Sequence, residues 1–134
     1  NDLDIYEDGE ESRDFIFIDD VVDATVLALE KEEASHQVFN VGSGVATTVL
    51  QVANTLKRLY ASDVKIKVSG KYRLGDIRHN YADLSKIKNV LGFSPKYDFQ
   101  KGISKFVEWV RVQEVKEDKY YKSIQELKSK GLIK

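Results

Sequence analysis

The stretch VFNVGSGVATTVLQVANTLKRLY, residues 38–60, carries the signals of a strand, a turn and a helix in succession. Val38–Val41 is a short apolar run typical of a β-strand. Gly42–Gly44 predicts a tight turn, and Thr47 or Thr48 can cap the next helix by accepting a hydrogen bond from a free backbone N–H. Apolar residues then recur at steps of three and four and predict one buried stripe: Val49, Val52, Ala53, Leu56, Leu59 and Tyr60. Strands that alternate with such helices define the α/β class.

The same alternation continues on both sides of this stretch. Residues 3–18 predict strand, turn and strand, with a hairpin turn at Asp8-Gly9 and a β-prone run at Phe15–Ile18. The further elements we expect are a helix over 21–32 capped by Asp19 or Asp20, a strand over 64–68, a short helix capped by Asp83 or Ser85 that ends at Gly92, and a last core helix from Asp98. Three or four strands make a thin sheet, as expected for a piece of a larger α/β protein.

Composition excludes several classes of function. The 134 residues are 42% hydrophobic and 32% charged, and the net charge of −1 does not favour a nucleic-acid or membrane partner. No apolar run approaches the roughly 18 residues of a membrane span. Cysteine is absent, which excludes disulfides and thiolate chemistry. His36 and His79 lack the spacing of metal ligands, so we expect no metal site.

Two short motifs suggest cofactor chemistry but are weak. Gly42-Ser43-Gly44 before a helix could hold a phosphate on free N–H groups, yet the dinucleotide pattern needs a third glycine. We favour a sharp strand-to-helix turn. YDFQK, residues 97–101, fits Tyr-x-x-x-Lys, but Pro95 and the expected cap Asp98 place Tyr97 outside the helix. We interpret this match as a coincidence.

A third motif, GKYRLGDIRHN at residues 70–80, crowds charged side chains around one glycine. Arginine grips phosphate with two parallel hydrogen bonds, which makes Arg73 and Arg78 candidates for a phosphate site. Asp76 could accept hydrogen bonds from sugar hydroxyls. Arg13, before the first apolar run, adds a third arginine. On chemistry alone, a solvated loop with surface ion pairs fits these residues equally well.

Four stretches together resemble, in order, the C-terminal half of the extended short-chain dehydrogenase/reductase family, and of its nucleotide-sugar epimerases in particular. They are DIYEDGEESRDFIFIDDVVDA (4–24), VFNVGSG (38–44), YRLGDIRHNYADLSKIKNVLGFSPK (72–96) and GISKFVEWV (102–110). The resemblance covers residues 1–112 and implies the C-terminal, nucleotide-sugar-binding part of a Rossmann-type epimerase. Residues 113–134 lie outside it and are expected to form a charged helical tail.

The resemblance also implies roles for single residues. Arg13 matches the arginine of the family's RDF motif and Arg73 that of R-x-G-D, and both would contact the nucleotide diphosphate, while Asp76 would face the ribose. Asp4, Ile5 and Tyr6 would line the uracil or thymine base. Asn80 falls where some members place a tyrosine near the nucleotide. Arg78 and His79 belong to a GDIRH variant and receive a weaker assignment.

The family's NAD-binding glycine motif and its catalytic Ser/Thr and Tyr-x-x-x-Lys are absent from this sequence. With no initiator Met, the chain is therefore expected to be a fragment, inactive alone, of a cytoplasmic, homodimeric, NAD-dependent 4-epimerase of UDP- or dTDP-sugars. The alternatives are a 4,6-dehydratase or reductase of the same family, a non-catalytic nucleotide-sugar-binding domain, and a structural module that assembles through the tail.

Overall fold

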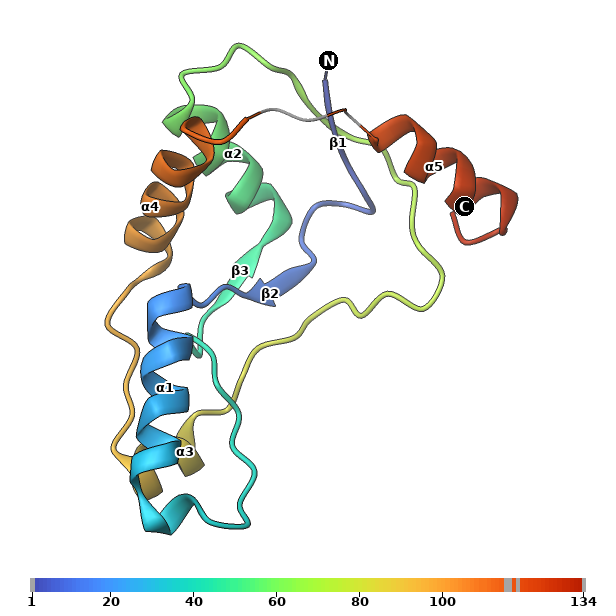
Figure 1. Ribbon diagram of the computed structural model, residues 1–134. Helices are drawn as coiled ribbons and strands as arrows, with labels where there is room; N and C mark the ends of the chain where they lie inside the picture. Colours follow the sequence, from blue (N-terminus) through green and yellow to red (C-terminus); the bar gives the residue numbers. More distant parts are fainter. Residues whose placement is uncertain (1, 115–116, 118, 134) are drawn as a thin grey trace.

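The computed structural model describes residues 2–114, 117 and 119–133, in which short strands and helices alternate (Figure 1). The elements are β1 (Leu3–Ile5), β2 (Ser12–Asp14), α1 (Ile18–Glu30), the 3₁₀ helix η1 (Glu32–Ala34), β3 (Ala46–Thr48), α2 (Val49–Leu59), β4 (Ile66–Val68), α3 (Ser85–Leu91), α4 (Phe99–Arg111) and α5 (Tyr120–Ser129). This order of elements confirms the predicted α/β class.

The strands form two separate pairs. β1 runs parallel to β4, with Leu3 opposite Ile66, and β2 runs antiparallel to β3, with Arg13 opposite Thr47. The hairpin predicted at Asp8-Gly9 is therefore wrong. A turn does form there, since Gly9 has a φ of +82° and its N–H donates to the Tyr6 carbonyl at 3.1 Å. The two strands it joins nevertheless pair with distant segments, and the Gly9 carbonyl instead accepts the N–H of Leu50 in α2.

Two further strand predictions are wrong. Phe15–Phe17 makes no strand ladder, and Ile18 already begins α1. The Phe15 ring lies 5.7 Å from the Phe99 ring and the Phe17 ring 4.7 Å from the Tyr97 ring, so the run packs by its side chains on the start of α4. Residues 38–41 also form no strand, and Val38 is 82% exposed.

The helix ends follow the sequence signals at most positions. Thr48 caps α2 in a capping box with Gln51, and Asp98 caps α4 by accepting the N–H of Lys101. Gly92 ends α3 with a φ of +71°. The expected caps of α1 and α3 are wrong, because Phe17 and Leu84 occupy those positions and neither makes a side-chain cap hydrogen bond. Asp20 is instead completely buried and accepts the N–H groups of Lys96 and Tyr97.

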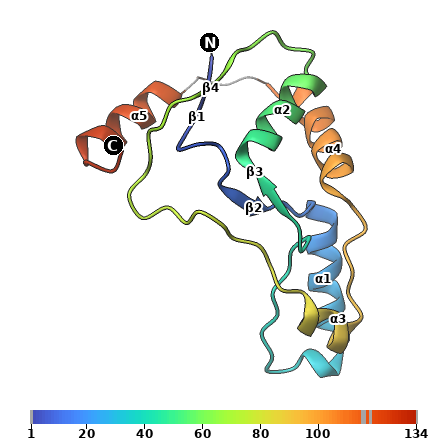
Figure 2. The same ribbon diagram turned by 180° about the vertical axis from the view of Figure 1, so that it is seen from behind.

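Two small apolar clusters hold the helices together. One lies between α1 and α3 and is built on Ala24, Ile87, Leu91 and Phe93. The other lies where α2 packs against α4, the pair beside β3 in the view from behind (Figure 2). Ala53 and Val107 are buried there. No described helix has the length and apolar character that crossing a bilayer requires.

The tail contains the helix α5, and the residues that follow this helix contact the 73–74 segment. α5 lies on the side of β1 opposite to α2 in both views (Figures 1 and 2). Beyond it, the Leu132 carbonyl accepts the N–H of Leu74, and Ile133 forms an antiparallel bridge with Arg73. Residues 115, 116, 118 and 134 of the tail lie outside the described residues.

Candidate nucleotide site

A pocket of about 320 Å³ opens beside β1 and β2 and contains most of the predicted site. Its lining residues are Asp4, Ile5, Tyr6, Glu7, Glu11, Arg13, Val49, Arg73, Asp76 and Tyr120. Six of the eight site residues named from the sequence are among them: Asp4, Ile5, Tyr6, Arg13, Arg73 and Asp76. The fold thus brings residues 4–13 next to residues 73–76.

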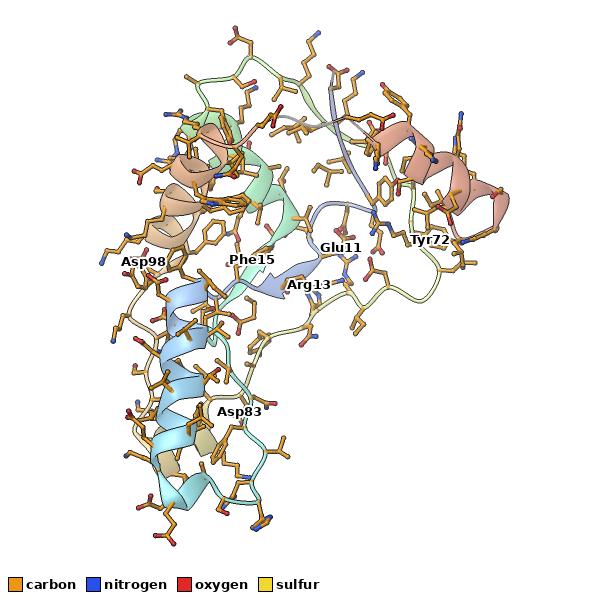
Figure 3. The ribbon with its side chains drawn as sticks, viewed as in Figure 1. Glu11, Arg13, Phe15, Tyr72, Asp83 and Asp98 are labelled. Atoms are coloured by element: carbon orange, nitrogen blue, oxygen red, sulfur yellow. The ribbon has the colours of Figure 1, made fainter. Side chains whose placement is uncertain are left out.

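Arg13 is held by hydrogen bonds on both terminal nitrogens of its guanidinium. Nη2 donates to Asp76 Oδ1 at 2.7 Å, while Nη1 donates to the carbonyls of Ser12 and Arg78 at 2.8 and 3.1 Å. The strand position of Arg13 in β2 directs its side chain toward the 73–78 segment, and Figure 3 shows it in the middle of the molecule. The Arg13 side chain is 32% exposed and therefore remains accessible to a ligand.

Arg73 enters the pocket from a tight turn. The Asp76 N–H donates to the Arg73 carbonyl at 3.3 Å, and Gly75, the third residue of this turn, has a φ of +79°. Such a backbone conformation favours glycine, which explains the residue at this position. The Arg73 guanidinium lies 5.4 Å from the centre of the Tyr6 ring, a cation–π contact that orients both side chains.

The first strand supplies the far wall of the pocket. Ile5 is 7% exposed and gives an apolar surface next to Tyr6. Asp4 accepts a hydrogen bond from Lys71 Nζ at 3.1 Å, and this bond raises the pKa of Lys71. An aromatic ring, an apolar side chain and a carboxylate together form a wall that suits a flat polar ring.

Arg78 and Asn80 do not line the pocket. Arg78 donates to Glu7 at 3.0 Å and to Asp8 at 2.6 Å, and its hydrogen bond holds the pKa of Asp8 below its usual value. The Asn80 N–H donates to the Ser12 carbonyl, and His79 Nδ1 lies 2.9 Å from Ser12 Oγ. Residues 78–80 therefore run along β2 and fix its position.

Asp14 is a residue whose importance the sequence analysis missed. Its carboxylate accepts hydrogen bonds from the N–H and hydroxyl of Ser43 and from the N–H groups of Gly44 and Ala82, at 2.6 to 3.1 Å. Burial raises the pKa of Asp14, but these hydrogen bonds outweigh it and bring the pKa below its usual value. Asp14 thus links β2 to the 43–44 loop and to Ala82. Its position directly after Arg13 in the sequence was the one feature that could have drawn attention to it.

The same contacts decide whether Gly42-Ser43-Gly44 could hold an NAD phosphate. Two of its N–H groups already donate to Asp14, so they are not free to bind a phosphate. A Cβ on Gly42 would also lie 2.7 Å from Ala82 Cβ and closer still to the Asp14 carboxylate. The loop does not fit the pyrophosphate of NAD. The interpretation as a strand-to-helix turn is also wrong, because residues 38–41 form no strand and β3 lies between the loop and α2.

Tyr97 and Lys101 likewise do not form a catalytic pair. Tyr97 precedes α4, and its ring packs on Phe17 with Lys105 Nζ 5.6 Å from the ring centre. Lys101 Nζ lies 4.0 Å from Asp98 instead.

In addition, no group of three His, Asp or Glu side chains suited to a metal ion occurs among the residues described.

Four pocket residues were not expected from the sequence: Glu7, Glu11, Val49 and Tyr120. Glu7 and Glu11 lie in the segment between β1 and β2, close in sequence to the predicted residues Ile5 and Tyr6, and this proximity was a usable signal. Val49 lines the pocket because the N-terminus of α2 packs against residues 9–11, where the Val49 N–H donates to the Glu11 carbonyl. Tyr120 comes from the tail, beyond the motifs that carried the resemblance.

Comparison with known proteins identifies the class. A family model described as GDP-mannose 4,6 dehydratase matches residues 2–106. The chain is also 39% identical over 106 residues to dTDP-L-rhamnose 4-epimerase of Burkholderia thailandensis, covering 79% of this chain and 29% of that protein. The chain belongs to the extended short-chain dehydrogenase/reductase family of nucleotide-sugar epimerases and dehydratases, which confirms the resemblance.

Solved structures of the family have the same fold. UDP-glucose 4-epimerase of Thermotoga maritima, determined with UDP-glucose, superposes with a TM-score of 0.72 at 38% identity, covering 83% of this chain and 35% of that one. UDP-glucuronic acid 4-epimerase of Bacillus cereus, as a Y149F mutant with a fluorinated UDP-sugar and NAD, gives 0.71 at 29% identity, with coverage of 83% and 35%. The family is NAD-dependent, and the chain spans about one third of the length of these relatives.

Proposed function

We propose that this chain is the nucleotide-diphosphate-binding part of an NAD-dependent 4-epimerase of UDP- or dTDP-sugars. Arg13 and Arg73 hold the diphosphate, Asp76 faces the ribose, and Asp4, Ile5 and Tyr6 line the base. Arg78 and Asn80 contribute by fixing the position of β2, since neither lines the pocket.

The observation that carries this proposal is the shared pocket of Arg13 and Arg73. Two guanidinium groups that line one pocket match the two negative charges of a diphosphate, and arginine forms strong charge-assisted hydrogen bonds with phosphate. The carbonyls of Ser12 and Arg78 hold Arg13 in place before a ligand arrives, which lowers the entropy cost of binding. Such an anchor lets the sugar turn over while the nucleotide stays fixed.

NAD and the catalytic residues belong, in this proposal, to a part of the protein outside this chain. NAD would accept the hydride there, while the present residues bind and orient the nucleotide. The relatives are about three times as long, which supports this division. A second pocket of about 370 Å³, lined mainly by apolar residues such as Phe15, Phe99 and Phe106, offers a surface for the remainder of the enzyme.

The chain alone is then inactive, and the whole enzyme is a cytoplasmic homodimer, as the family resemblance implies. Incubation of the purified chain with UDP-glucose and NAD is expected to give no UDP-galactose. NAD-dependent turnover by the chain alone would contradict the division of labour proposed here.

A nucleotide-sugar 4,6-dehydratase is the second candidate, because the matching family model carries that description. Both activities need the same diphosphate anchor. The product formed by the whole protein from UDP-glucose or dTDP-glucose distinguishes them, since a dehydratase releases water and yields a 4-keto-6-deoxy sugar. An epimerase yields the C4-inverted sugar of unchanged mass.

The proposal is tested by calorimetric titration of the chain with UDP and dTDP. Replacing both Arg13 and Arg73 by alanine should weaken binding at least about tenfold per arginine, because charge-assisted hydrogen bonds are lost. The matched control is Arg58→Ala with Lys88→Ala, two exposed cations outside the pocket. This control removes the same net charge and should bind as the parent chain does.

Binding that is lost only in the Arg13/Arg73 variant would support the assigned anchor. Equal loss in the control would mean that net charge, rather than the pocket, governs binding. The absence of binding to the parent chain, with binding by a longer protein that contains it, would place the complete site across both parts. Absence in both would contradict the proposal.

A further inference from the structure

Glu11 has the least satisfied carboxyl group in the candidate site. It precedes β2, is only 7% exposed and lines the nucleotide pocket. Its Oε1 is buried and has no hydrogen-bond partner among the described residues. The nearest cation, Arg78 Nη1, lies 3.8 Å away, beyond hydrogen-bond distance. Buried polar atoms are nearly always hydrogen-bonded, so this exception calls for a reason.

Glu11 shares its cation with two other carboxylates. Arg78 donates to Glu7 at 3.0 Å and to Asp8 at 2.6 Å, and Glu11 is the third acid at the same guanidinium. Burial raises the pKa of Glu11, and the neighbouring carboxyls of Glu7 and Asp8 raise it further. One guanidinium cannot satisfy three carboxylates, so the group that accepts a proton most readily is Glu11.

The charges around the pocket leave an excess of negative charge when every group is ionised. The acids are Asp4 from β1, Glu7 and Asp8 from the following turn, Glu11, and Asp76 from the 73–76 turn; the cations are Lys71, Arg13, Arg73 and Arg78. Five carboxylates thus face four cations. α2 contributes uncharged Val49 to the lining, and α5 contributes Tyr120. A dianionic diphosphate entering this pocket would make the imbalance larger.

We infer that Glu11 binds a proton when the nucleotide diphosphate enters, so that one proton is taken up with each ligand. The inference rests on the proposed function, since it requires a diphosphate in this pocket. A second anion near a buried carboxylate strongly disfavours its ionised form, because like charges in a poorly solvated site repel. Protonation of Glu11 removes one of these charges at the position of greatest burial.

Glu11 acts in this inference as a positioning residue. It packs at the guanidinium of Arg78, and the carbonyl of Arg78 accepts a hydrogen bond from Arg13 Nη1. Its own backbone carbonyl accepts the N–H of Val49 at the start of α2. When Glu11 is neutral, Arg78 has only the carboxylates of Glu7 and Asp8 as ionic partners, which stabilises the position of the Arg78 carbonyl that holds the Arg13 guanidinium.

The test is titration calorimetry with UDP-glucose, whose diphosphate carries no titratable proton in the range used. Binding is measured from pH 5.5 to 8.5 in two buffers of different ionisation enthalpy, from which the number of protons bound per ligand follows. The parent chain should take up close to one proton, and its Kd should rise about tenfold per pH unit, over the interval between the pKa of Glu11 in the free chain and its higher pKa in the complex. Glu11→Gln, a neutral isostere, should bind without proton uptake and with a nearly constant Kd.

The matched control is Glu10→Gln, which makes the same chemical change at an exposed neighbouring residue that does not line the pocket. It should behave as the parent chain does. Binding by the parent chain without proton uptake would overturn the inference and leave the proposed function intact. Proton uptake that persists in Glu11→Gln, or a folded Glu11→Gln that no longer binds, would also overturn it. Failure of the parent chain to bind would instead contradict nucleotide binding by this chain.

Discussion

Arg13 Nη2 lies 2.7 Å from Asp76 Oδ1, although the two residues are 63 positions apart in the sequence. The ion pair joins β2 to the 73–76 turn, and both of its residues line the candidate pocket. It also means that the guanidinium proposed to bind a diphosphate already has an anionic partner. A ligand must therefore compete with Asp76 for Arg13, unless Asp76 turns to a hydroxyl group of the same ligand.

Asp76→Asn distinguishes the pairing of Asp76 with Arg13 from its proposed contact with the ribose hydroxyls. The neutral amide competes less strongly for Arg13, so binding of inorganic pyrophosphate should strengthen by about threefold to tenfold. Binding of UDP-glucose should weaken relative to pyrophosphate, because the amide is a poorer acceptor for the ribose hydroxyls. Calorimetry with both ligands measures the ratio. Asp63→Asn, which removes the same charge from an exposed site outside the pocket, is the control. An unchanged ratio would argue against contact between Asp76 and the ribose.

Asp14 should be the most costly polar residue to change near the site. Asp14→Asn places an NH₂ group where donors from Ser43, Gly44 and Ala82 converge, and we expect a loss of about 2–4 kcal/mol in the free energy of unfolding at pH 7. Urea denaturation measures this loss. Glu108→Gln, an exposed change on α4, should alter the free energy of unfolding by less than about 0.5 kcal/mol.

The same residue predicts a dependence of stability on pH. The pKa of Asp14 is lowered in the folded chain, so its contribution is fully present above the ordinary value of 3.8 and is lost as the pH falls through the lowered value. The stability difference between the parent chain and Asp14→Asn should therefore narrow in strong acid. A difference that stays constant from pH 7 to below pH 3 would show that the charge of Asp14 is not what stabilises the loop.

Asp20 should stabilise the fold at a place distant from the pocket. Asp20→Ala leaves the N–H groups of Lys96 and Tyr97 without their acceptor in a buried setting, and we expect a loss of about 2–4 kcal/mol. Asp20→Asn retains one acceptor oxygen and should lose less. Thermal and urea unfolding measure both variants. Equal losses in the two variants would contradict this expectation and would mean that both carboxylate oxygens are needed, since the NH₂ group of asparagine must face one of the two N–H donors.

Thr48 offers a milder test of local structure. Thr48→Ala removes the hydroxyl that accepts the Gln51 N–H and should lower the free energy of unfolding by about 1 kcal/mol. Thr48→Ser retains the hydroxyl and should stay close to the parent chain. Chemical denaturation of the two variants gives the comparison, and a serine variant as unstable as the alanine variant would exclude capping as the cause.

The sequence predicted those features that depend on nearby residues. The α2 helix, the Thr48 and Asp98 caps and the left-handed end at Gly92 are local, and the structure confirms each. The buried stripe predicted for α2 is wrong in part, because only Ala53 of its six residues is buried and Tyr60 is 39% exposed. The α/β class and the family follow from the same patterns together with the motifs. The grouping of Arg13 with Arg73 came from the resemblance, and the two residues do line one pocket.

The wrong predictions all concern partners far away in the sequence. Phe15–Phe17 has strong β propensity, yet its rings pack on Tyr97 and Phe99, and no strand of the described residues pairs with it. Asp20 has the residue type of a cap, but the loop before α4 supplies the two N–H groups that it accepts. Propensity describes the chain locally, whereas tertiary packing decides between elements of similar propensity.

The packing of Phe15 on Phe99 also bears on how the protein is made. The two residues are separated by 84 positions, so at the usual 5–20 residues per second the ribosome needs roughly 4–17 s to produce the partner ring after the first. During that interval Phe15, Ile16 and Phe17 form an uncovered apolar β-prone segment, the kind that chaperones bind and that aggregates when it is not covered. The yield of soluble protein should thus depend on the rate of translation and on the supply of chaperones, in addition to the stability of the folded chain.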